Sequence, residues 1–213
     1  MNISSSEQGR CLCGAVRFSV PRPPHEIGMC HCGMCRRWAG GGPLVGGVVD
    51  AVTVTAGEAL QWYASSGWGE RGFCGECGSS LFWRQKGAAG GWLVCAAALP
   101  DNGAARLGQH IFIDDKPAYY DMADAAPRLT GAEFTAAVVA KMPAAKRVFV
   151  KTFIALQAAK NRFRPPSPPP ADGDRRGACL CGEVRFSLPQ AAADASICHC
   201  GQCRRWGGGA GVV

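Results

Sequence analysis

Cysteines are the residues of this sequence whose type and spacing could do chemistry. Of the 13 cysteines, only Cys95 has no other cysteine within a few positions. The others form five clusters: Cys11/Cys13, Cys30/Cys32/Cys35, Cys74/Cys77, Cys179/Cys181 and Cys198/Cys200/Cys203. Thiols this close in sequence suit a small metal ion better than disulfide bonds, which are rare in the reducing cytoplasm. The clusters therefore predict metal binding.

Two of the clusters can build one closed metal site. Cys11/Cys13 and Cys74/Cys77 together offer four thiolates, which is the donor set of a tetrahedral structural zinc. Such a site leaves no position for a substrate. The alternative is a set of buried cysteines without a ligand, and zinc is the preferred interpretation because two close pairs supply a full set of ligands.

The cluster Cys30, Cys32 and Cys35 is different because it offers three thiolates with no fourth cysteine nearby. Three protein ligands and one exchangeable position are typical of catalytic zinc. His31 could also be a ligand, but its place between two ligands favours a supporting role with the ring turned away. We therefore expect function at the three cysteines.

Positive charge follows this cluster directly. Arg36 and Arg37 could hold an anionic ligand or lower the pKa of the thiols, or they could simply be solvated. The net charge of the whole chain is +7, but the excess of Lys and Arg lies in residues 141–176. Because the rest of the chain is close to neutral, its charge argues against a nucleic-acid partner.

The segment CHCGMCRRW at residues 30–38 recurs as CHCGQCRRW at residues 198–206, and residues 9–38 align with 177–206 without a gap. This repeat predicts a complete domain at 9–140, a linker at 141–176 and a truncated second copy at 177–213. The second copy stops before any counterpart of Cys74/Cys77. We expect it to be mobile or loosely docked, with Cys198, Cys200 and Cys203 as a possible weak zinc site.

The first copy has mostly β patterning. Val16, Phe18 and Val20 alternate with other residues, as in a half-buried strand. Further apolar or β-branched runs occur at 44–55, 60–63, 81–83, 92–97 and 110–113. Thr130 and Glu133 form a capping box that predicts one short C-terminal helix over residues 134–141.

The linker has two parts. The first is basic, with Phe149, Phe153 and Leu156 at helical spacing, and could contact an acidic membrane or nucleic acid or simply cover an apolar surface. The second, Pro165–Pro170, is an extended spacer. The N-terminus MNISSSEQGR has no apolar run behind it, and no stretch reaches the roughly 20 residues of a membrane span. We expect a cytoplasmic chain.

Four segments in this order resemble the glutathione-dependent formaldehyde-activating family, which includes centromere protein V. They are GRCLCGAVRF, CHCGMCRRW, RGFCGECGSSLFWR and HIFIDDKPAYYD. The resemblance implies a mainly β, Mss4-like compact zinc-binding fold with two zinc ions in the first domain. It also implies a structural zinc on Cys11, Cys13, Cys74 and Cys77 and a catalytic zinc on Cys30, Cys32 and Cys35.

The reaction that the resemblance implies is carbon–sulfur lyase chemistry: formaldehyde and the glutathione thiol condense to S-hydroxymethylglutathione. The alternative is a non-catalytic zinc-stabilised binding module similar to centromere protein V, and zinc handling or thiol sensing is a third possibility. His110 and the pair Tyr119/Tyr120 are expected to be core or edge residues rather than catalysts. Cys95 is expected to be a buried small hydrophobe.

Overall fold

The structure is a computed structural model that describes residues 7–87, 91–100, 105–144, 146–152, 176–190, 194–209 and 211–212. The proline run, Phe153 and Leu156 lie outside these residues. The described part of the chain is mostly β, as predicted. None of the described helices has the length and apolar character needed to cross a membrane.

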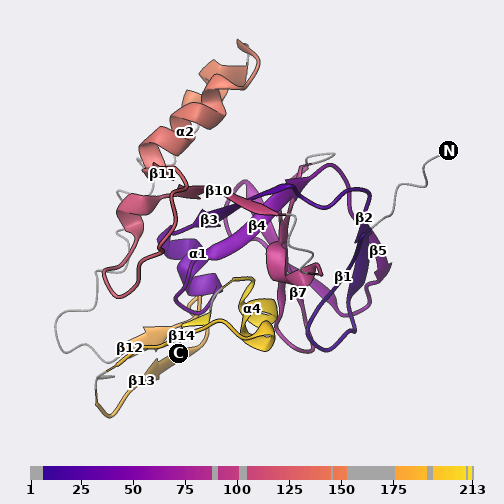
Figure 1. The fold of residues 1–213 in the computed structure, drawn as a ribbon, viewed down its shortest axis with the longest axis vertical. Coiled ribbons are helices and arrows are strands. Elements are labelled where there is room, and N and C mark those ends of the chain that lie inside the picture. Colours follow the sequence, from indigo (N-terminus) through magenta and orange to yellow (C-terminus); the bar gives the residue numbers. More distant parts are fainter. Residues whose placement is uncertain are drawn as a thin grey trace.

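A large sheet of eight strands forms the body of the first domain (Figure 1). Its order is β11-β10-β3-β4-β9-β8-β7-β6. The strands are β3 (Glu26–Cys30), β4 (Leu44–Val49), β6 (Leu60–Tyr63), β7 (Gly69–Cys74), β8 (Ser80–Gln85), β9 (Trp92–Cys95), β10 (Arg106–Ile111) and β11 (Arg128–Leu129). The pairs of β10 with β3 and β11 are parallel, and the other pairs are antiparallel.

A second sheet of three strands packs against the large sheet. It consists of β1 (Glu7–Arg10), β2 (Arg17–Val20) and β5 (Thr53–Ala56), in the order β1-β2-β5. Val16, Phe18 and Val20 are fully buried, which confirms the alternation seen in the sequence. The rings of Phe18 and Phe82 meet edge to face at 4.8 Å between centroids, so the core lies between the two sheets.

The apolar run over residues 44–55 contains two strands in different sheets, because β4 ends at Val49 and β5 begins at Thr53. The run 92–97 also ends early: β9 stops at Cys95, and Ala96–Ala98 form the 3₁₀ helix η1. A second 3₁₀ turn, η2, spans Ile113–Asp115. The sequence pattern therefore located strands better than it located their ends.

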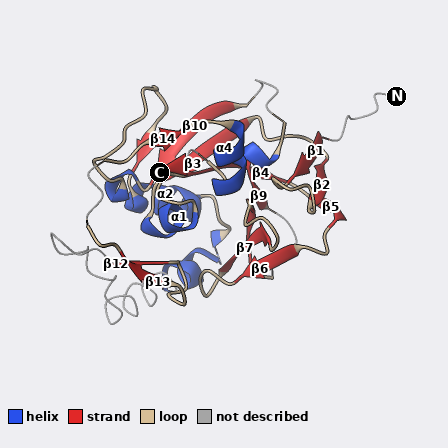
Figure 2. Ribbon diagram, turned by 90° about the horizontal axis from the view of Figure 1, so that it is seen from below, coloured by secondary structure: helices blue, strands red, loops and turns tan. Residues whose placement is uncertain are grey.

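Among the described residues of the first copy are the α-helices α1 and α2, both labelled in Figure 2. The helix α2 (Gly131–Ala140) has Thr130 as its N-cap, and both hydrogen bonds of the predicted capping box to Glu133 are present. The helix α1 (Gly33–Trp38) was not predicted from the sequence, because six residues are too few to show a helical period.

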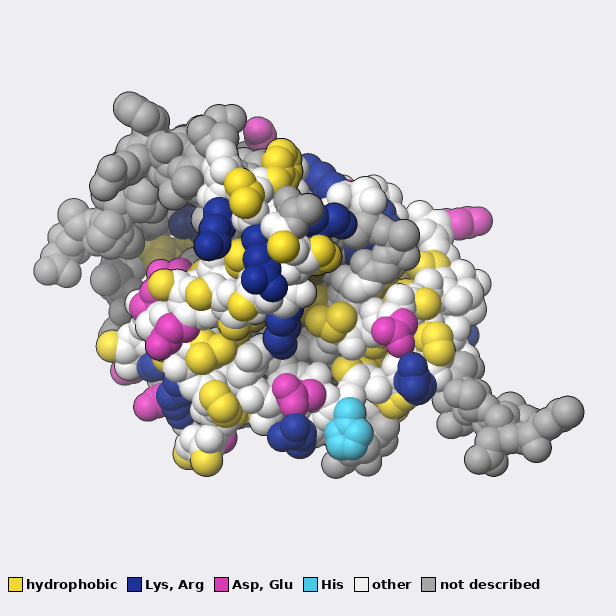
Figure 3. Space-filling model, turned by 90° about the horizontal axis from the view of Figure 1, so that it is seen from above, with side chains coloured by type: hydrophobic (Ala, Val, Ile, Leu, Met, Phe, Trp, Pro, Cys, Tyr) yellow, Lys and Arg dark blue, Asp and Glu magenta, His cyan; other side chains and the backbone are white. Residues whose placement is uncertain are grey.

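The basic segment continues from α2. Residues 146–152 are helical, and the side chains of Val148 and Phe149 are 71% and 73% exposed. Figure 1 shows α2 projecting from the body, and Figure 3, which looks down on the molecule from above, shows Lys and Arg side chains next to hydrophobic ones. The segment is thus an exposed, mixed basic and apolar surface.

The second copy forms a smaller unit that contacts the first domain. Its elements are β12 (Arg176–Ala178), β13 (Arg185–Ser187), β14 (Ile197–Cys198), α4 (Gly201–Gly207) and β15 (Gly211–Val212). Trp206 Nε1 donates to the carbonyl of Cys77 at 2.8 Å, and Arg205 Nε donates to the carbonyl of Ala97 at 3.2 Å. The expectation of a mobile or loosely docked copy is therefore wrong for α4.

Glycine explains why α4 docks so closely. Gly207, Gly208 and Gly209 are buried, and the carbonyl of Gly208 accepts a hydrogen bond from the backbone N–H of Val45 at 2.9 Å. Gly208 has a φ of 76°, which other residues rarely adopt. Without side chains, this backbone can lie directly against the start of β4.

Candidate metal centres

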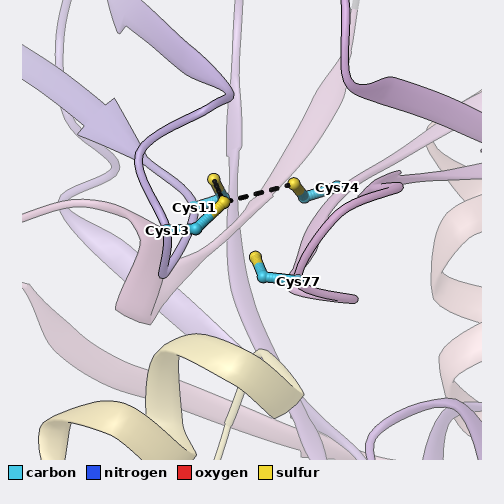
Figure 4. Close-up of side chains that lie close together, drawn as sticks. All are labelled: Cys11, Cys13, Cys74 and Cys77. Atoms are coloured by element: carbon cyan, nitrogen blue, oxygen red, sulfur yellow. Dashed lines mark hydrogen bonds between the residues drawn. The ribbon is translucent and has the colours of Figure 1, made fainter.

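The four-cysteine group lies where the two sheets meet. Cys11 and Cys13 come from the loop between β1 and β2, and Cys74 and Cys77 come from the end of β7 and the turn after it. Their sulfur atoms all lie within 4.8 Å of one another. Figure 4 shows the four side chains pointing toward a common centre, and the sulfurs of Cys13 and Cys74 are 3.8 Å apart.

The spacing of these sulfurs fits a tetrahedral zinc. Zn–S bonds of about 2.3 Å place pairs of sulfurs about 3.8 Å apart, and the measured separations include 3.5 Å between Cys11 and Cys13. The backbone N–H of Val16 donates to Cys11 Sγ at 3.2 Å. Such backbone donors stabilise sulfur ligands in their charged form.

Ser79 joins the two halves of this group, and sequence reasoning missed it. Its hydroxyl accepts from the backbone N–H of Leu12 at 3.0 Å and lies 3.2 Å from Cys77 Sγ. Burial alone would raise the pKa of Cys77, but hydrogen bonds, led by that of the Ser79 hydroxyl, outweigh it and lower the pKa to about 6. The serine therefore favours a thiolate at Cys77.

The three-cysteine group lies at the start of α1. Cys30 ends β3, Cys32 is the N-cap of α1 and Cys35 lies within the helix. Their sulfurs also lie within 4.8 Å of one another, and Cys32 Sγ accepts from the backbone N–H of Cys35 at 3.4 Å. The short helix that was not predicted is thus the element that gathers these ligands.

Charge within the group is uneven. Hydrogen bonds from the thiols of Cys30 and Cys32 lower the pKa of Cys35, and the nearby Arg71 adds to the effect. Arg71 Nη2 donates to Cys35 Sγ at 3.3 Å. Hydrogen bonds with the thiols of Cys32 and Cys35 raise the pKa of Cys30, and its burial acts in the same direction. Cys35 is therefore the first of the three to carry negative charge.

The two arginines after the cluster do different things. Arg36 Nε donates to the carbonyl of His31 at 3.0 Å, which ties the helix to the loop that carries the cysteines. Arg37 is exposed. Arg71, which sequence reasoning did not single out, is the arginine that contacts a cysteine sulfur of this group.

His31 uses both of its ring nitrogens in hydrogen bonds, so its ring is turned away from the cysteines as expected. Nδ1 lies 2.8 Å from the Tyr120 hydroxyl, and Nε2 lies 2.9 Å from His110 Nδ1. His110 Nε2 in turn lies 3.0 Å from a carboxylate oxygen of Asp124. These four side chains form one chain of hydrogen bonds.

The carboxylate fixes the direction of this chain. Asp124 can only accept when ionised, so His110 donates through Nε2 and accepts at Nδ1. His31 then donates through Nε2, and its Nδ1 accepts from the hydroxyl of Tyr120. Burial, followed by the neighbouring His110, lowers the pKa of His31 to about 4, which agrees with the neutral ring that this pattern needs.

His110 and Tyr120 are buried, as core residues would be, whereas Tyr119 is 52% exposed. The pKa of Asp124 is lowered first by the backbone N–H of Ala126 and then by His110. Asp124 had no signal in the sequence, because an isolated aspartate in a loop gives no pattern. Cys95 is buried as expected, and burial raises its pKa to about 12.

The second copy repeats part of this geometry. The sulfurs of Cys198, Cys200 and Cys203 lie within 4.8 Å of one another, and Cys200 Sγ accepts from the backbone N–H of Cys203 at 3.4 Å. Cys200 is exposed, whereas its counterpart Cys32 is half-buried. The pair Cys179/Cys181 gains no third ligand among the residues that the structure describes.

Two known proteins resemble parts of this chain in sequence. An uncharacterized lyase of Schizosaccharomyces pombe is 27% identical over 132 residues, which cover 62% of this chain and 96% of that protein. A protein of Halomonas elongata, provisionally named a glutathione-dependent formaldehyde-activating enzyme, is 38% identical over 84 residues. These cover 35% of this chain and 54% of that protein.

A crystal structure of a Rhodobacter sphaeroides protein covers 57% of this chain and 98% of its own chain, at 19% identity and a TM-score of 0.37. The sequence profile described as glutathione-dependent formaldehyde-activating enzyme matches residues 6–115 and again residues 174–213. Both matched segments contain the clustered cysteines of their copy. The chain thus belongs to the glutathione-dependent formaldehyde-activating enzyme family.

Proposed function

We propose that the unit formed by residues 9–140 is a zinc-dependent carbon–sulfur lyase that joins a thiol such as glutathione to formaldehyde or a related carbonyl compound. The observation that carries this proposal is the difference between its two cysteine groups. One supplies four ligands and the other three, in a chain of this family. We also propose that the fold of this unit is Mss4-like and binds zinc.

The residues present fit two zinc ions. Cys11, Cys13, Cys74 and Cys77 would hold the structural ion, and Cys30, Cys32 and Cys35 would hold the second. A zinc ion with three protein thiolates supplies a Lewis acid and a position for a substrate. In the proposed reaction the thiol sulfur bonds to the carbonyl carbon, the π bond of the C=O group breaks, and the thiol proton passes to the oxygen. In reverse, the carbon–sulfur bond breaks.

The surrounding residues position the three cysteines. The hydrogen-bond chain from Asp124 to Tyr120 holds His31, and Arg36 holds the backbone carbonyl of His31. Because His31 lies between Cys30 and Cys32, these contacts fix the loop from both its side chain and its backbone. A fixed loop keeps the ligands in place without help from the substrate.

Activity with glutathione and formaldehyde tests the proposal. The purified chain should form or break down the adduct faster than buffer with the same amount of free zinc, and Cys35→Ser should abolish the excess rate. Cys203→Ser removes the equivalent cysteine of the second copy and should leave the excess rate unchanged. A wild-type rate equal to that of the buffer would rule out the lyase.

One observation favours the alternative of a binding module. The segment 146–152 exposes Val148 and Phe149 beside basic residues, which is a surface that could contact an acidic partner. Salt-sensitive binding of nucleic acid that is lost on deletion of residues 146–164, without any excess rate, would support this alternative.

A further inference from the structure

The helix α4 of the second copy carries part of a cysteine group but is short. It has seven residues, with Cys200 as its N-cap and Cys203 inside it, and Cys198 ends β14. The three sulfurs lie within 4.8 Å of one another, which suits a metal ion that prefers thiolates, such as zinc. An isolated helix shorter than about 12 residues is marginal in water. Another part of the molecule must therefore hold α4 if the three sulfurs are to stay together.

The corresponding helix α1 of the first copy is held by its own domain. The ring of Trp38 at its end stacks on Tyr63 of β6 and meets Phe73 of β7 edge to face, with centroids 5.8 and 5.6 Å apart. Trp206 is the counterpart of Trp38 in the repeat, and it is 56% exposed. The second copy therefore does not hold α4 in the way that the first domain holds α1.

The first domain supplies contacts to α4 instead. Trp206 Nε1 donates to the carbonyl of Cys77 at 2.8 Å, and Arg205 Nε donates to the carbonyl of Ala97 at 3.2 Å. The glycines at 207–209 are buried. All of these contacts lie in the last turn of α4 or directly after it, whereas Cys200 lies at its start.

Backbone hydrogen bonds connect the cysteines to the docked end of the helix. The carbonyl of Cys200 accepts from the N–H of Arg204 at 3.0 Å, and the carbonyl of Arg204 accepts from the N–H of Gly208 at 3.0 Å. The carbonyl of Gly208 then accepts from the N–H of Val45 in the first domain at 2.9 Å. A metal ion would fix the start of this series, and docking fixes its end. Ordering one end lowers the entropy cost of ordering the other.

We infer that Cys198, Cys200 and Cys203 form a metal site whose affinity depends on the docking of α4 onto the first domain, and that bound metal in turn strengthens this docking. The first domain thus replaces the support that β6 and β7 give to α1. Because coupling between two binding events is reciprocal, both effects have the same size. The inference concerns the second copy and does not rest on the proposed lyase activity.

Cobalt binding to the full chain tests the inference through the sulfur-to-cobalt absorption bands. The parent chain carries Cys32→Ser to disable the first three-cysteine group, and one equivalent of zinc first fills the four-cysteine group. Added cobalt should then produce bands that the further substitution Cys200→Ser removes. Gly209→Ala should weaken this cobalt binding at least about fivefold, the lower end of typical coupling between sites. The reason is that a Cβ at Gly209 would overlap the carbonyl oxygen of Pro43 in the first domain.

Gly209→Ala acts on docking rather than on the helix, because Gly209 lies beyond Gly208, the C-cap of α4. Gly201→Ala is the matched control. It lies within α4, a Cβ there would meet nothing within 4 Å, and it should leave cobalt affinity unchanged. Equal cobalt affinity in Gly209→Ala and the parent chain, or a parent chain without bands that depend on Cys200, would overturn the inference.

Hydrogen exchange in the parent chain covers the case in which Gly209→Ala does not fold. In the ¹⁵N-labelled parent chain, a second equivalent of zinc should slow exchange of the Val45 N–H at least about fivefold, since docking protects this group. The same addition to the chain with Cys200→Ser should not change the exchange rate. A rate at Val45 that zinc leaves unchanged in the parent chain would overturn the inference.

Discussion

At the scale of single residues, the two cysteine groups of the first domain differ in how many protein ligands they offer. A closed four-thiolate site exchanges its metal more slowly than a site with an open position. We therefore expect metal analysis during graded chelation to show two steps. Cys74→Ser should unfold the domain, because a structural zinc contributes on the order of 10 kcal/mol of folding free energy.

Cys32→Ser is the matching variant for the three-cysteine group. This variant should lose one zinc ion, and circular dichroism should show that the domain stays folded. The reason is that the backbone around Cys32 is also held by α1 and by the contacts of His31. If both substitutions unfold the domain equally, the division into a structural and a catalytic group is wrong.

Asp124 gives a second prediction at this scale. Asp124→Ala leaves the buried Nε2–H of His110 without its acceptor, which should lower the unfolding free energy by about 1–3 kcal/mol in urea denaturation. Asp121→Ala is the control, because Asp121 forms its ion pairs at the surface with a side chain that is 74% exposed. It should cost at most about 1 kcal/mol. Equal losses in the two variants would show that the buried hydrogen bond between His110 and Asp124 contributes little to the unfolding free energy.

The residues of the candidate sites were predictable from the sequence only where they recur at short spacing. The cysteines meet this condition, because a few residues of one loop place two or three sulfurs together. Ser79, Arg71 and Asp124 do not. Each reaches its partner through the pairing of strands or the path of a loop that is distant in sequence, which no local pattern records.

At the scale of elements, the pair of strands β3 and β4 carries the loop of the three-cysteine group, because Cys30 pairs with Leu44. Gly28 and Gly46 face each other in this pair. A Cβ at Gly46 would lie 2.6 Å from the carbonyl oxygen of Val94, whereas a Cβ at Gly28 would have its nearest neighbour at 3.6 Å. The two glycines are paired, yet only one lacks room.

Gly46→Ala should therefore lower the unfolding free energy by about 1–3 kcal/mol, the usual cost of overpacking. It should also lower the metal affinity of the Cys30, Cys32 and Cys35 group, since β4 must move. Gly28→Ala should have little effect on either quantity. Urea denaturation measures the unfolding free energy of both variants, and metal titration measures their metal affinity. Equal stability of the two variants would contradict the close packing at Gly46.

The sequence predicts an element well where apolar residues alternate regularly or where the residues of a helix cap are all present. The alternation at Val16–Val20 and the box at Thr130 are of this kind. The strand β7 was not predicted, because Gly69, Arg71 and Gly72 break the apolar pattern. Arg71 is tolerated in this buried strand by its contacts with Cys35 and Trp38, so tertiary structure overrides local preference there.

At the scale of the whole molecule, the second copy is attached to the first through the glycines after α4. A Cβ at Gly208 would lie 2.9 Å from Cys95 Sγ and 3.0 Å from Leu44 Cδ1. The φ angle of Gly208 is also positive. The truncated repeat predicts a mobile or loosely docked segment here. The contact depends on how closely two parts of the chain that are distant in sequence fit together. The run of glycines does not reveal this fit.

Gly208→Ala should detach α4 from the first domain. The backbone N–H of Val45 would then lose its acceptor, and its hydrogen exchange should become about tenfold faster or more, as expected from a left-handed residue penalty of about 1–2 kcal/mol. Gly201→Ala is the control, because a Cβ there would meet nothing within 4 Å. Unchanged exchange at Val45 in Gly208→Ala would show that α4 is held by other contacts.

The four-cysteine group also has a consequence for the order of events during synthesis. Cys13 and Cys74 are separated by 61 positions, so at about 5–20 residues per second the first pair of thiols exists for about 3–12 seconds before its partners are made. During this interval the nascent chain has only half of a metal site. The thiols must stay reduced, and any zinc they take up early must remain in place until Cys77 completes the set.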